Sequence, residues 1–436
     1  MRKAVFTTIA TIATVIGSDT LLAQESTAQR EFPADLGFRP FAYIEKDEDV
    51  FPPGMTARTI IRCGDDLTLD RGYQFRDNPD FICWIPRDGR RGWLFVNHEI
   101  EDLHPGDERP SPEMQNKSGG MTRLLLDENL EIVESGMHVW QTSNNCSGIV
   151  TPWNTILTCE EYPNTDGEAP PPPHLDGHMY TWEVDPSKPG MFERRPALGR
   201  FSHEAAEFDL DGNLYQTEDQ TPGFIYRFVP EKPGDLTRGE LTALDAVRKR
   251  WVTVEDRARA HRSSLKAGAT PFARPEGIAR HPKQPDWLYF ALSGGAEKWD
   301  HPWGNYPLGA VLAVNVRTCE VKEIVVGRPQ QESRGVTGQM QHPDNIRFDA
   351  AGNLYICEDH KNKKLKIENG VAKNHGRNEV LVWHEQSREL YRFAVMGKAD
   401  SEWTGPWFAD TGRGRTLFLA NQKDPGVVYA IHPEAR

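Results

Sequence analysis

Cysteine, long apolar runs and positive charge are all scarce in this chain of 436 residues. Six cysteines are too few for disulfides to form the main scaffold, although Cys63 and Cys83 could pair in an oxidising compartment. No segment has the roughly 18 apolar residues that a membrane-spanning helix needs. The formal net charge of −13 argues against nucleic acid as a partner, because phosphate backbones bind clustered Lys and Arg.

Turn-forming and acidic residues are plentiful instead. The 37 Gly and 32 Pro favour many short strands over long helices. The 64 Asp and Glu residues could serve metal cations where they cluster. The length allows two or three ordinary domains or one large closed all-β domain.

The N-terminus has the pattern of a secretory signal peptide. Arg2 and Lys3 form a positive start, residues 4–16 form a short apolar run interrupted by Thr, and Ala23 suits the position before a cleavage site. We therefore expect residues 1–23 to be removed on export and residues 24–436 to form a single domain. The expected location is the periplasm or the extracellular medium, with no membrane attachment after cleavage. The alternative is a disordered chain end.

One stretch of sequence occurs twice. Residues 208–219 and 348–359 are identical at eight of twelve positions. Each is typical of a strand, a tight Asp/Gly/Asn turn and a second strand, because these turn residues tolerate positive φ and the flanks are rich in apolar residues.

Weaker copies of the second strand bring the number to six. The equivalent positions are Leu94, Leu157, Leu214, Leu288, Leu354 and Leu417. Their spacing of 57–74 residues suits blades of four strands with generous loops, so the sequence predicts an all-β, six-bladed β-propeller. A solenoid is the rival architecture, but its repeats are usually shorter. Residues 231–270 break the pattern and are expected to carry a short helix in an insertion.

A second position recurs 10–12 residues before these leucines. It is occupied by Cys146, Glu204, Glu276 and Asp344. Equivalent positions in successive blades converge on the centre of a propeller, where unneutralised acids would repel one another and be costly to bury. Cations relieve both costs. Carboxylates suit Ca2+, Mg2+ or Fe3+, and a thiolate favours a softer or transition metal.

Acidic residues also end the repeated strands. They are Glu99, Glu160 with Glu161, Glu218 with Asp219, and Glu358 with Asp359. Strand side chains alternate, so one member of each pair can point inward, and the sequence does not say which. We take Glu99, Glu161 and Glu358 as further candidate metal ligands.

Arg274 stands two residues before Glu276, so an extended chain would put both on one face. A guanidinium beside a metal cluster suits an anionic substrate. The alternative is that Arg274 only balances the charge of Glu276.

Several of these segments resemble the PhoX-type alkaline phosphatases. The matching segments are Asn97–Glu99, Asn145–Gly148, Thr151–Trp153, Thr158–Glu161, Gly199–Glu204, Arg274–Gly277, Asp344–Asn345, Glu358–Asp359 and Thr404–Pro406. The resemblance implies a six-bladed propeller that hydrolyses phosphate monoesters with two ferric ions (Fe3+), calcium ions (Ca2+) and a bridging oxo group. It also implies that Cys146 bridges the irons, that Glu204 and Glu276 help to complete the cluster, and that Arg274 meets the phosphate.

We therefore expect an exported monomer that acts on a small phosphorylated substrate. Two alternatives stay open. One is a calcium-dependent, lactonase-like hydrolase, in which Cys146 would be dispensable. The other is a non-enzymatic binding propeller stabilised by calcium.

Overall fold

The computed structural model describes residues 31–100, 111–161, 177–329, 335–361, 366–368, 371–372, 376–398, 400–423 and 426–434. The chain divides into two compact units, Met1–Asp35 and Leu36–Arg436. The predicted signal peptide, residues 1–23, lies outside the described residues. No helix in the described ranges is both long and apolar enough to cross a bilayer.

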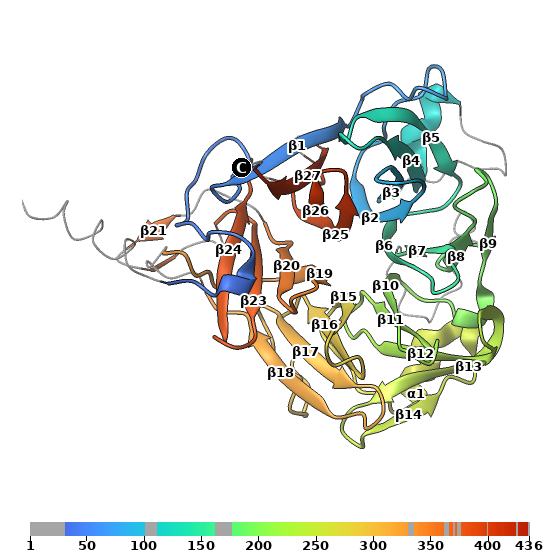
Figure 1. Cartoon of the computed structure of the whole chain (residues 1–436). Helices are drawn as coiled ribbons and strands as arrows, with labels where there is room; N and C mark the ends of the chain where they lie inside the picture. The colour runs from blue at the N-terminus through green and yellow to red at the C-terminus, as the bar shows by residue number, and fades with distance from the viewer. Residues whose placement is uncertain are drawn as a thin grey trace, which may run out of the picture. The chain divides into compact units, whose positions relative to one another are not determined.

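Six antiparallel sheets form a ring in the unit Leu36–Arg436 (Figure 1). Their innermost strands contact one another in succession around the centre. The predicted six-bladed propeller is therefore confirmed. We number the blades in the chain order of their innermost strands.

The first three blades follow one another along the chain. Blade 1 contains β2 (Pro79–Pro86), β3 (Gly92–His98), β4 (Gly120–Leu126) and β5 (Ile132–Val139). Blade 2 contains β6 (Asn145–Val150), β7 (Ile156–Glu160), β8 (Thr181–Val184) and β9 (Phe192–Arg194). Blade 3 contains β10 (His203–Phe208), β11 (Leu214–Glu218), β12 (Ile225–Lys232), β13 (Asp235–Asp245) and β14 (Arg250–Thr253).

The next two blades repeat the arrangement. Blade 4 contains β15 (Pro275–Arg280), β16 (Trp287–Leu292), β17 (Ala310–Asn315) and β18 (Val321–Val326). Blade 5 contains β19 (Pro343–Phe348), β20 (Leu354–Glu358), β23 (Glu379–His384) and β24 (Glu389–Val395). A separate hairpin is formed by β21 (Ile367–Glu368) and β22 (Val371–Ala372).

Blade 6 joins distant parts of the sequence. It contains β25 (Trp403–Thr411), β26 (Gly414–Asn421), β27 (Val427–Pro433) and, as its outermost strand, β1 (Met55–Arg62). Met55 pairs with Pro433 and Arg62 with Val427. The ring is thus closed by hydrogen bonds between an early and a late strand, which holds the first and last blades together.

The repeated sequence motif is a hairpin with a tight turn. The Asp209 carboxylate accepts the backbone N–H of Asn213 at 2.9 Å, and Asp349 accepts that of Asn353 at 2.8 Å. Gly212 between them in the first copy has φ of +82°, which suits a residue without Cβ. The turns predicted from the two copies are therefore confirmed.

The six repeated leucines lie in the cores between the sheets. They are at most 3% exposed, and burial of each contributes about 1.5–3 kcal/mol. The short helix predicted within residues 231–270 exists as α1 (Ala260–Ala267), but β13 and β14 of that stretch belong to the sheet of blade 3 and not to an insertion. The short 3-10 helices are η1 (Ala34–Leu36), η2 (Pro112–Lys117), η4 (Pro196–Leu198) and η5 (Arg257–Arg259).

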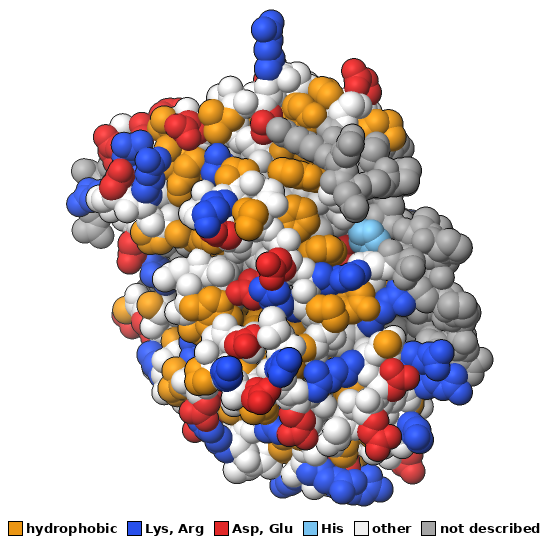
Figure 2. All heavy atoms as spheres, turned by 90° about the vertical axis from the view of Figure 1, so that its right-hand side faces the viewer, with side chains coloured by type: hydrophobic (Ala, Val, Ile, Leu, Met, Phe, Trp, Pro, Cys, Tyr) orange, Lys and Arg blue, Asp and Glu red, His pale blue; other side chains and the backbone are white. Residues whose placement is uncertain are grey.

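Charges of both signs are mixed on the surface that Figure 2 shows, and none of the cysteines forms a disulfide. On the face that carries β9 and β13, basic and acidic side chains are interspersed rather than gathered by sign (Figure 2). All six cysteines are free thiols. The possible pair Cys63–Cys83 is not formed, and the Cys63 thiol donates to the carbonyl of Arg76 at 3.2 Å.

Candidate metal centre

The same β-bulge interrupts the first strand pair of every blade. In blade 1, Pro79 pairs with His98 and Ile82 with Val96, so two residues of β2 face one of β3. The register shifts in the same way between β6 and β7, β10 and β11, β15 and β16, β19 and β20, and β25 and β26. A bulge re-aims the side chain of its extra residue. The first unpaired residues are Asp80, Cys146, Glu204, Glu276, Asp344 and Gly405.

The bulge position of blade 6 is occupied by Gly405, which has no side chain. Its φ is +61°, and a Cβ there would lie 2.3 Å from the carbonyl oxygen of Asp80. Its backbone N–H donates to the side-chain oxygen of Asn345 at 2.8 Å. Blade 6 instead contributes Glu402, which lies three residues earlier.

A second set of acids follows the second strand of the blades. Glu99, Glu161 and Asp359 each stand one residue beyond the end of that strand, and each belongs to a group of potential metal ligands. Asp219 stands at the same position in blade 3, where it pairs with Arg274. The inward member of each acidic pair is therefore the second one.

The first member of each pair holds the backbone of its own blade. Glu358 accepts the backbone N–H groups of Gln341 at 2.7 Å and Glu379 at 3.0 Å. Glu160 and Glu218 are equally buried and accept hydrogen bonds from His178 and His261. Glu358, which the sequence analysis took as a metal ligand, is therefore not brought to the centre, because strand alternation turns it away and Asp359 inward.

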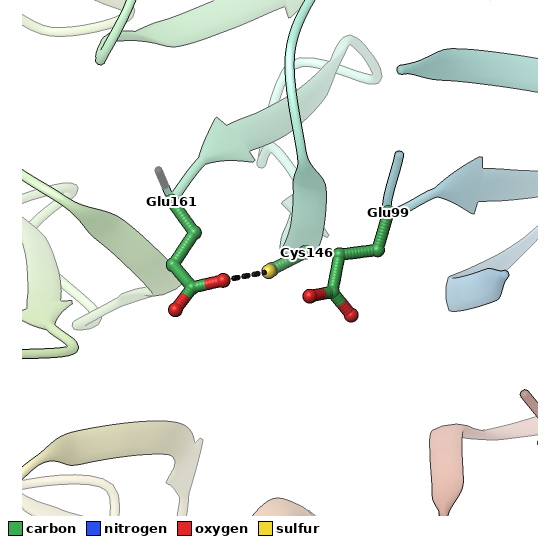
Figure 3. Close-up of side chains that lie close together, drawn as sticks. All are labelled: Glu99, Cys146 and Glu161. Atoms are coloured by element: carbon green, nitrogen blue, oxygen red, sulfur yellow. Dashed lines mark hydrogen bonds between the residues drawn. The ribbon is translucent and has the colours of Figure 1, made fainter. Parts of the chain in front are cut away.

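Three groups of potential metal ligands meet at the centre. They are Glu99 with Cys146 and Glu161, Glu204 with Glu276 and Asp344, and Asp344 with Asp359 and Glu402. Within each group the donor atoms lie within 4.8 Å of one another. Figure 3 shows Cys146 between Glu161 and Glu99, with its thiol donating to the Glu161 carboxylate at 3.1 Å. We call these eight residues, together with Asp80 and Asp219, the acidic centre.

Burial makes this arrangement electrostatically costly. It raises the pKa of Asp344 to about 7, with the charge of Asp359 as the next cause. Burial likewise raises the pKa of Glu161, Glu204 and Glu276 well above the ordinary range, and neighbouring carboxylates add to each shift. The pKa of the Cys146 thiol is raised for the same two reasons.

Two cations stand at the edge of the acidic centre. The Arg274 guanidinium binds both oxygens of Asp219, at 2.9 and 2.7 Å, and reaches Glu276 at 3.0 Å. Lys423 lies 3.0 Å from Glu402. The charge of Glu276 raises the pKa of Arg274. Burial by itself lowers the pKa of Lys423, but Glu402 and Glu99 raise it above the ordinary range.

Arg274 lies beside Glu276, but not because the two residues share one face of an extended chain. Arg274 precedes β15 and has φ of +53°, so it is not part of an extended chain with Glu276. The left-handed residue folds the guanidinium back beside the carboxylate. The two side chains do meet, as the sequence analysis expected.

The donor set fits metal cations. The acidic centre holds nine carboxyl groups and one thiol. Among the described residues only two cations pair with them, Arg274 with Asp219 and Glu276, and Lys423 with Glu402. Buried carboxylates at this density need positive charge or protons. Carboxylate oxygens suit Ca2+ and Fe3+, and the single thiol favours a transition metal in its group.

Comparison with models of protein families shows to which family the chain belongs. A family model described as alkaline phosphatase PhoX matches residues 127–426, more than half of the chain. The chain belongs to the PhoX family. The match contains Cys146, Glu204, Arg274, Glu276 and Asp344.

Two solved structures resemble this PhoX-family chain to different degrees. One is Pseudomonas fluorescens PhoX in complex with vanadate, a transition state analogue, with a TM-score of 0.71 and 20% identity over 91% of this chain and 98% of that one. Another is XC5397 of Xanthomonas campestris, a gluconolactonase, with a TM-score of 0.49 and 10% identity over 90% of this chain and 98% of that one. A search of curated protein sequences finds no match.

The structure adds residues to the centre that the sequence analysis missed. These are Asp80, Glu402 and Lys423, whereas Asp219 and Asp359 were named only as members of acidic pairs whose inward side chain the sequence left open. Asp80 was missed because 14 residues separate it from Leu94, more than in the other blades. A local signal could have found it, since Pro79 precedes it as Pro275 precedes Glu276 and Pro343 precedes Asp344.

Proposed function

We propose that this PhoX-family protein is a metal-dependent phosphatase that hydrolyses phosphate monoesters at the acidic centre. The observation that carries the proposal is a half-exposed arginine fixed beside a buried group of metal-ligating carboxylates. The membership in the PhoX family supports it. So does the shared fold with Pseudomonas fluorescens PhoX, which is described in complex with vanadate, a transition state analogue.

The proposed metal ligands combine both sets of inward side chains. They are Cys146, Glu99, Glu161, Glu204, Glu276 and Asp344, with Asp359 and Glu402 added and Glu358 removed. We propose Fe3+ and Ca2+ as the metals, with the transition metal in the group that contains the thiol. Bound cations would supply Lewis-acid polarisation of the phosphoryl oxygens.

Arg274 is positioned to bind the substrate phosphate. Its Nε and Nη2 atoms are committed to Asp219 and Glu276, whereas Nη1 makes no hydrogen bond with any described residue. The side chain is 39% exposed, so this edge of the guanidinium is open to a ligand. The two hydrogen bonds to Asp219 keep the Arg274 guanidinium from rotating. Less conformational entropy is therefore lost when Arg274 binds a phosphate.

Lys423 offers a second positive charge. It is half exposed and anchored by Glu402, a member of a different ligand group from Glu276. We propose that Arg274 and Lys423 contact different oxygens of one phosphoryl group. Arg274 supplies directional hydrogen bonds and Lys423 a compact charge.

The biological setting follows from the N-terminal pattern. We propose that residues 1–23 direct export and that the mature protein acts in the periplasm or outside the cell as a monomer. N-terminal sequencing of the protein recovered from a native-like host would test the cleavage after Ala23. Sedimentation analysis would test the monomer.

The test of the activity is hydrolysis of p-nitrophenyl phosphate by protein purified without added metal. We expect turnover at alkaline pH and iron together with calcium on elemental analysis. Arg274→Ala should lower turnover by about 10²- to 10³-fold, because it removes a donor from the developing charge. Arg317→Ala is the matched control, since Arg317 is an exposed residue paired with Asp286 at 3.1 Å.

Two results would contradict the proposal. One is a fully metal-loaded protein that releases no phosphate from any monoester. The other is Cys146→Ser protein with unchanged metal content and activity towards a lactone, which would favour a lactonase-like hydrolase.

A further inference from the structure

A cavity lies at the end of the inner strands opposite to the acidic centre. Its volume is about 530 Å³. The acidic centre uses the N-terminal ends of these strands, whereas this cavity is lined by their C-terminal ends, including Glu207 of β10 and Arg347 of β19. Each stands three residues after a member of the acidic centre, so the two sites are separated by about 10 Å along the strands.

Arg347 is stacked on an aromatic ring in this cavity. Its guanidinium carbon lies 3.9 Å from the centre of the Trp407 ring. It makes no ion pair or hydrogen bond with any described residue. Burial lowers the pKa of Arg347, but a guanidinium stays protonated in proteins. A positive charge is therefore held in a hollow of the protein without an acceptor for its N–H groups.

A second arginine lines the same cavity. Arg280, at the end of β15, has a half-buried side chain with no hydrogen bond or ion pair among the described residues. Both guanidinium groups therefore belong to the wall of one cavity, where the charge of Glu207 raises the pKa of Arg347 and that of Arg280 lowers it. Two like charges at one cavity favour an anion between them.

The protein itself supplies only part of the compensation. Glu207 also lines the cavity, but its carboxylate oxygens accept backbone N–H groups from Phe208 at 2.9 Å and from Arg280 at 3.4 Å. Two arginines and one glutamate leave one net positive charge. Arg280 and Arg347 are both partly buried, so the uncompensated charge is partly desolvated, and an anionic ligand would offset that cost.

Apart from His281, which lies 3.6 Å from Glu385, the rest of the lining is apolar. It includes Ile149, Val150, Leu210, Pro282, Phe348 and Trp407. A cavity of this size with a mostly apolar wall and a few charged groups is typical of small-molecule sites.

We propose that this cavity, which we call the arginine cavity, binds a small organic anion. A carboxylate or phosphoryl group of the ligand lies between Arg280 and Arg347, and its apolar body packs against Trp407 and the aliphatic wall. The site is separate from the acidic centre and needs no metal.

The test is calorimetric titration of the metal-loaded mature protein with two probes. Phenylphosphonate has a P–C bond that phosphate monoester hydrolysis does not cleave, and benzoate is the carboxylate of matching shape. We expect Arg347→Met to weaken binding at this site at least about tenfold, because a charge-assisted contact to the anion is lost. Binding of phenylphosphonate alone would assign a phosphoryl ligand, and binding of both a general oxyanion site.

Variants at both ends of the strands separate this site from the acidic centre. Arg274→Ala should leave the benzoate titration unchanged, and Arg317→Met is the control for loss of an exposed arginine. Arg280→Gln should weaken binding independently, so the test stands even if Arg347→Met does not fold. The proposal is overturned if neither probe binds at millimolar concentration. It is also overturned if only Arg274→Ala abolishes binding.

Discussion

The inner strand β19 carries opposite charge at its two ends. Glu204 and Asp344 belong to the acidic centre, while three residues further along β19 the chain places Arg347 over Trp407. An acid occupies the bulge position in four of six blades and Cys146 occupies it in a fifth, whereas the arginines come from two blades only. A residue type that recurs at one position in most blades indicates that these blades contribute to one site at the centre of the ring. Arginines found in only two blades indicate a site that the repeat itself does not produce.

The largest expected effect is loss of metal from the acidic centre. Prolonged chelation should abolish phosphate release and lower the melting temperature, because binding at about 1,000 times the dissociation constant contributes about 4 kcal/mol. Differential scanning calorimetry with elemental analysis measures both. Chelated protein with an unchanged melting temperature would show that the carboxylates are neutralised by protons alone.

The next effect concerns the thiol of the first ligand group. Cys146→Ser should reduce iron content and activity at least about tenfold, since a hydroxyl is a weaker ligand than a thiolate for a transition metal. Cys159→Ser is the matched control, because Cys159 is buried in β7 beside Thr181, away from the ligand groups. Equal loss of metal in both variants would place the effect in folding rather than ligation.

One pair of neighbouring acids tests the inward and outward assignment. Asp359→Asn should lower metal content and turnover, whereas Glu358→Gln should keep both. Glu358→Gln should instead destabilise the fold by about 1–3 kcal/mol, since one of two buried backbone N–H groups loses its acceptor. Urea denaturation measures the second effect. The reverse pattern would return Glu358 to the metal site.

The metal-free protein should respond to pH. The pKa of Asp344 rises on folding from about 3.8 to about 7, so the folded state binds more protons than the unfolded state between these values. The contribution of Asp344 to the free energy of unfolding of the metal-free protein should therefore be highest below pH 4. This contribution should fall as the pH rises towards 7. Metal-loaded protein should lack this decline. Denaturation at pH 5 and pH 8, with and without metal, measures the difference.

The smallest expected effect lies at the arginine cavity. Without a ligand, Arg347→Met should change stability by less than about 1 kcal/mol or raise it, because an incompletely compensated charge is removed. Arg392→Met is the contrast, since buried Arg392 pairs with Glu379 at 3.1 Å and breaking such a pair costs about 3–5 kcal/mol. A large loss of stability in Arg347→Met would make Arg347 a structural residue.

Much of the fold could be predicted because each blade of a propeller repeats similar local sequence patterns. The Asp–x–x–Gly–Asn turn and the buried leucine of each second strand depend on neighbouring residues and on burial alone. The bulged positions of Cys146, Glu204, Glu276 and Asp344 could be aligned on those leucines. Blade 6 could not be aligned in this way, because its ring position is Gly405 and its acid, Glu402, lies three residues earlier.

The amino-acid sequence by itself determined the number of blades, the acidic character of the centre and four of the residues at the bulges. Tertiary structure alone decided that Asp359 rather than Glu358 faces inward, since alternation permits either until the blade has a fixed orientation. It also decided that Arg274 reaches Glu276 through a left-handed turn, and that Lys423 and Glu402 complete the site. The three ligand groups join residues from different blades, for example Glu99 of blade 1 with Cys146 of blade 2, and only the ring brings them together.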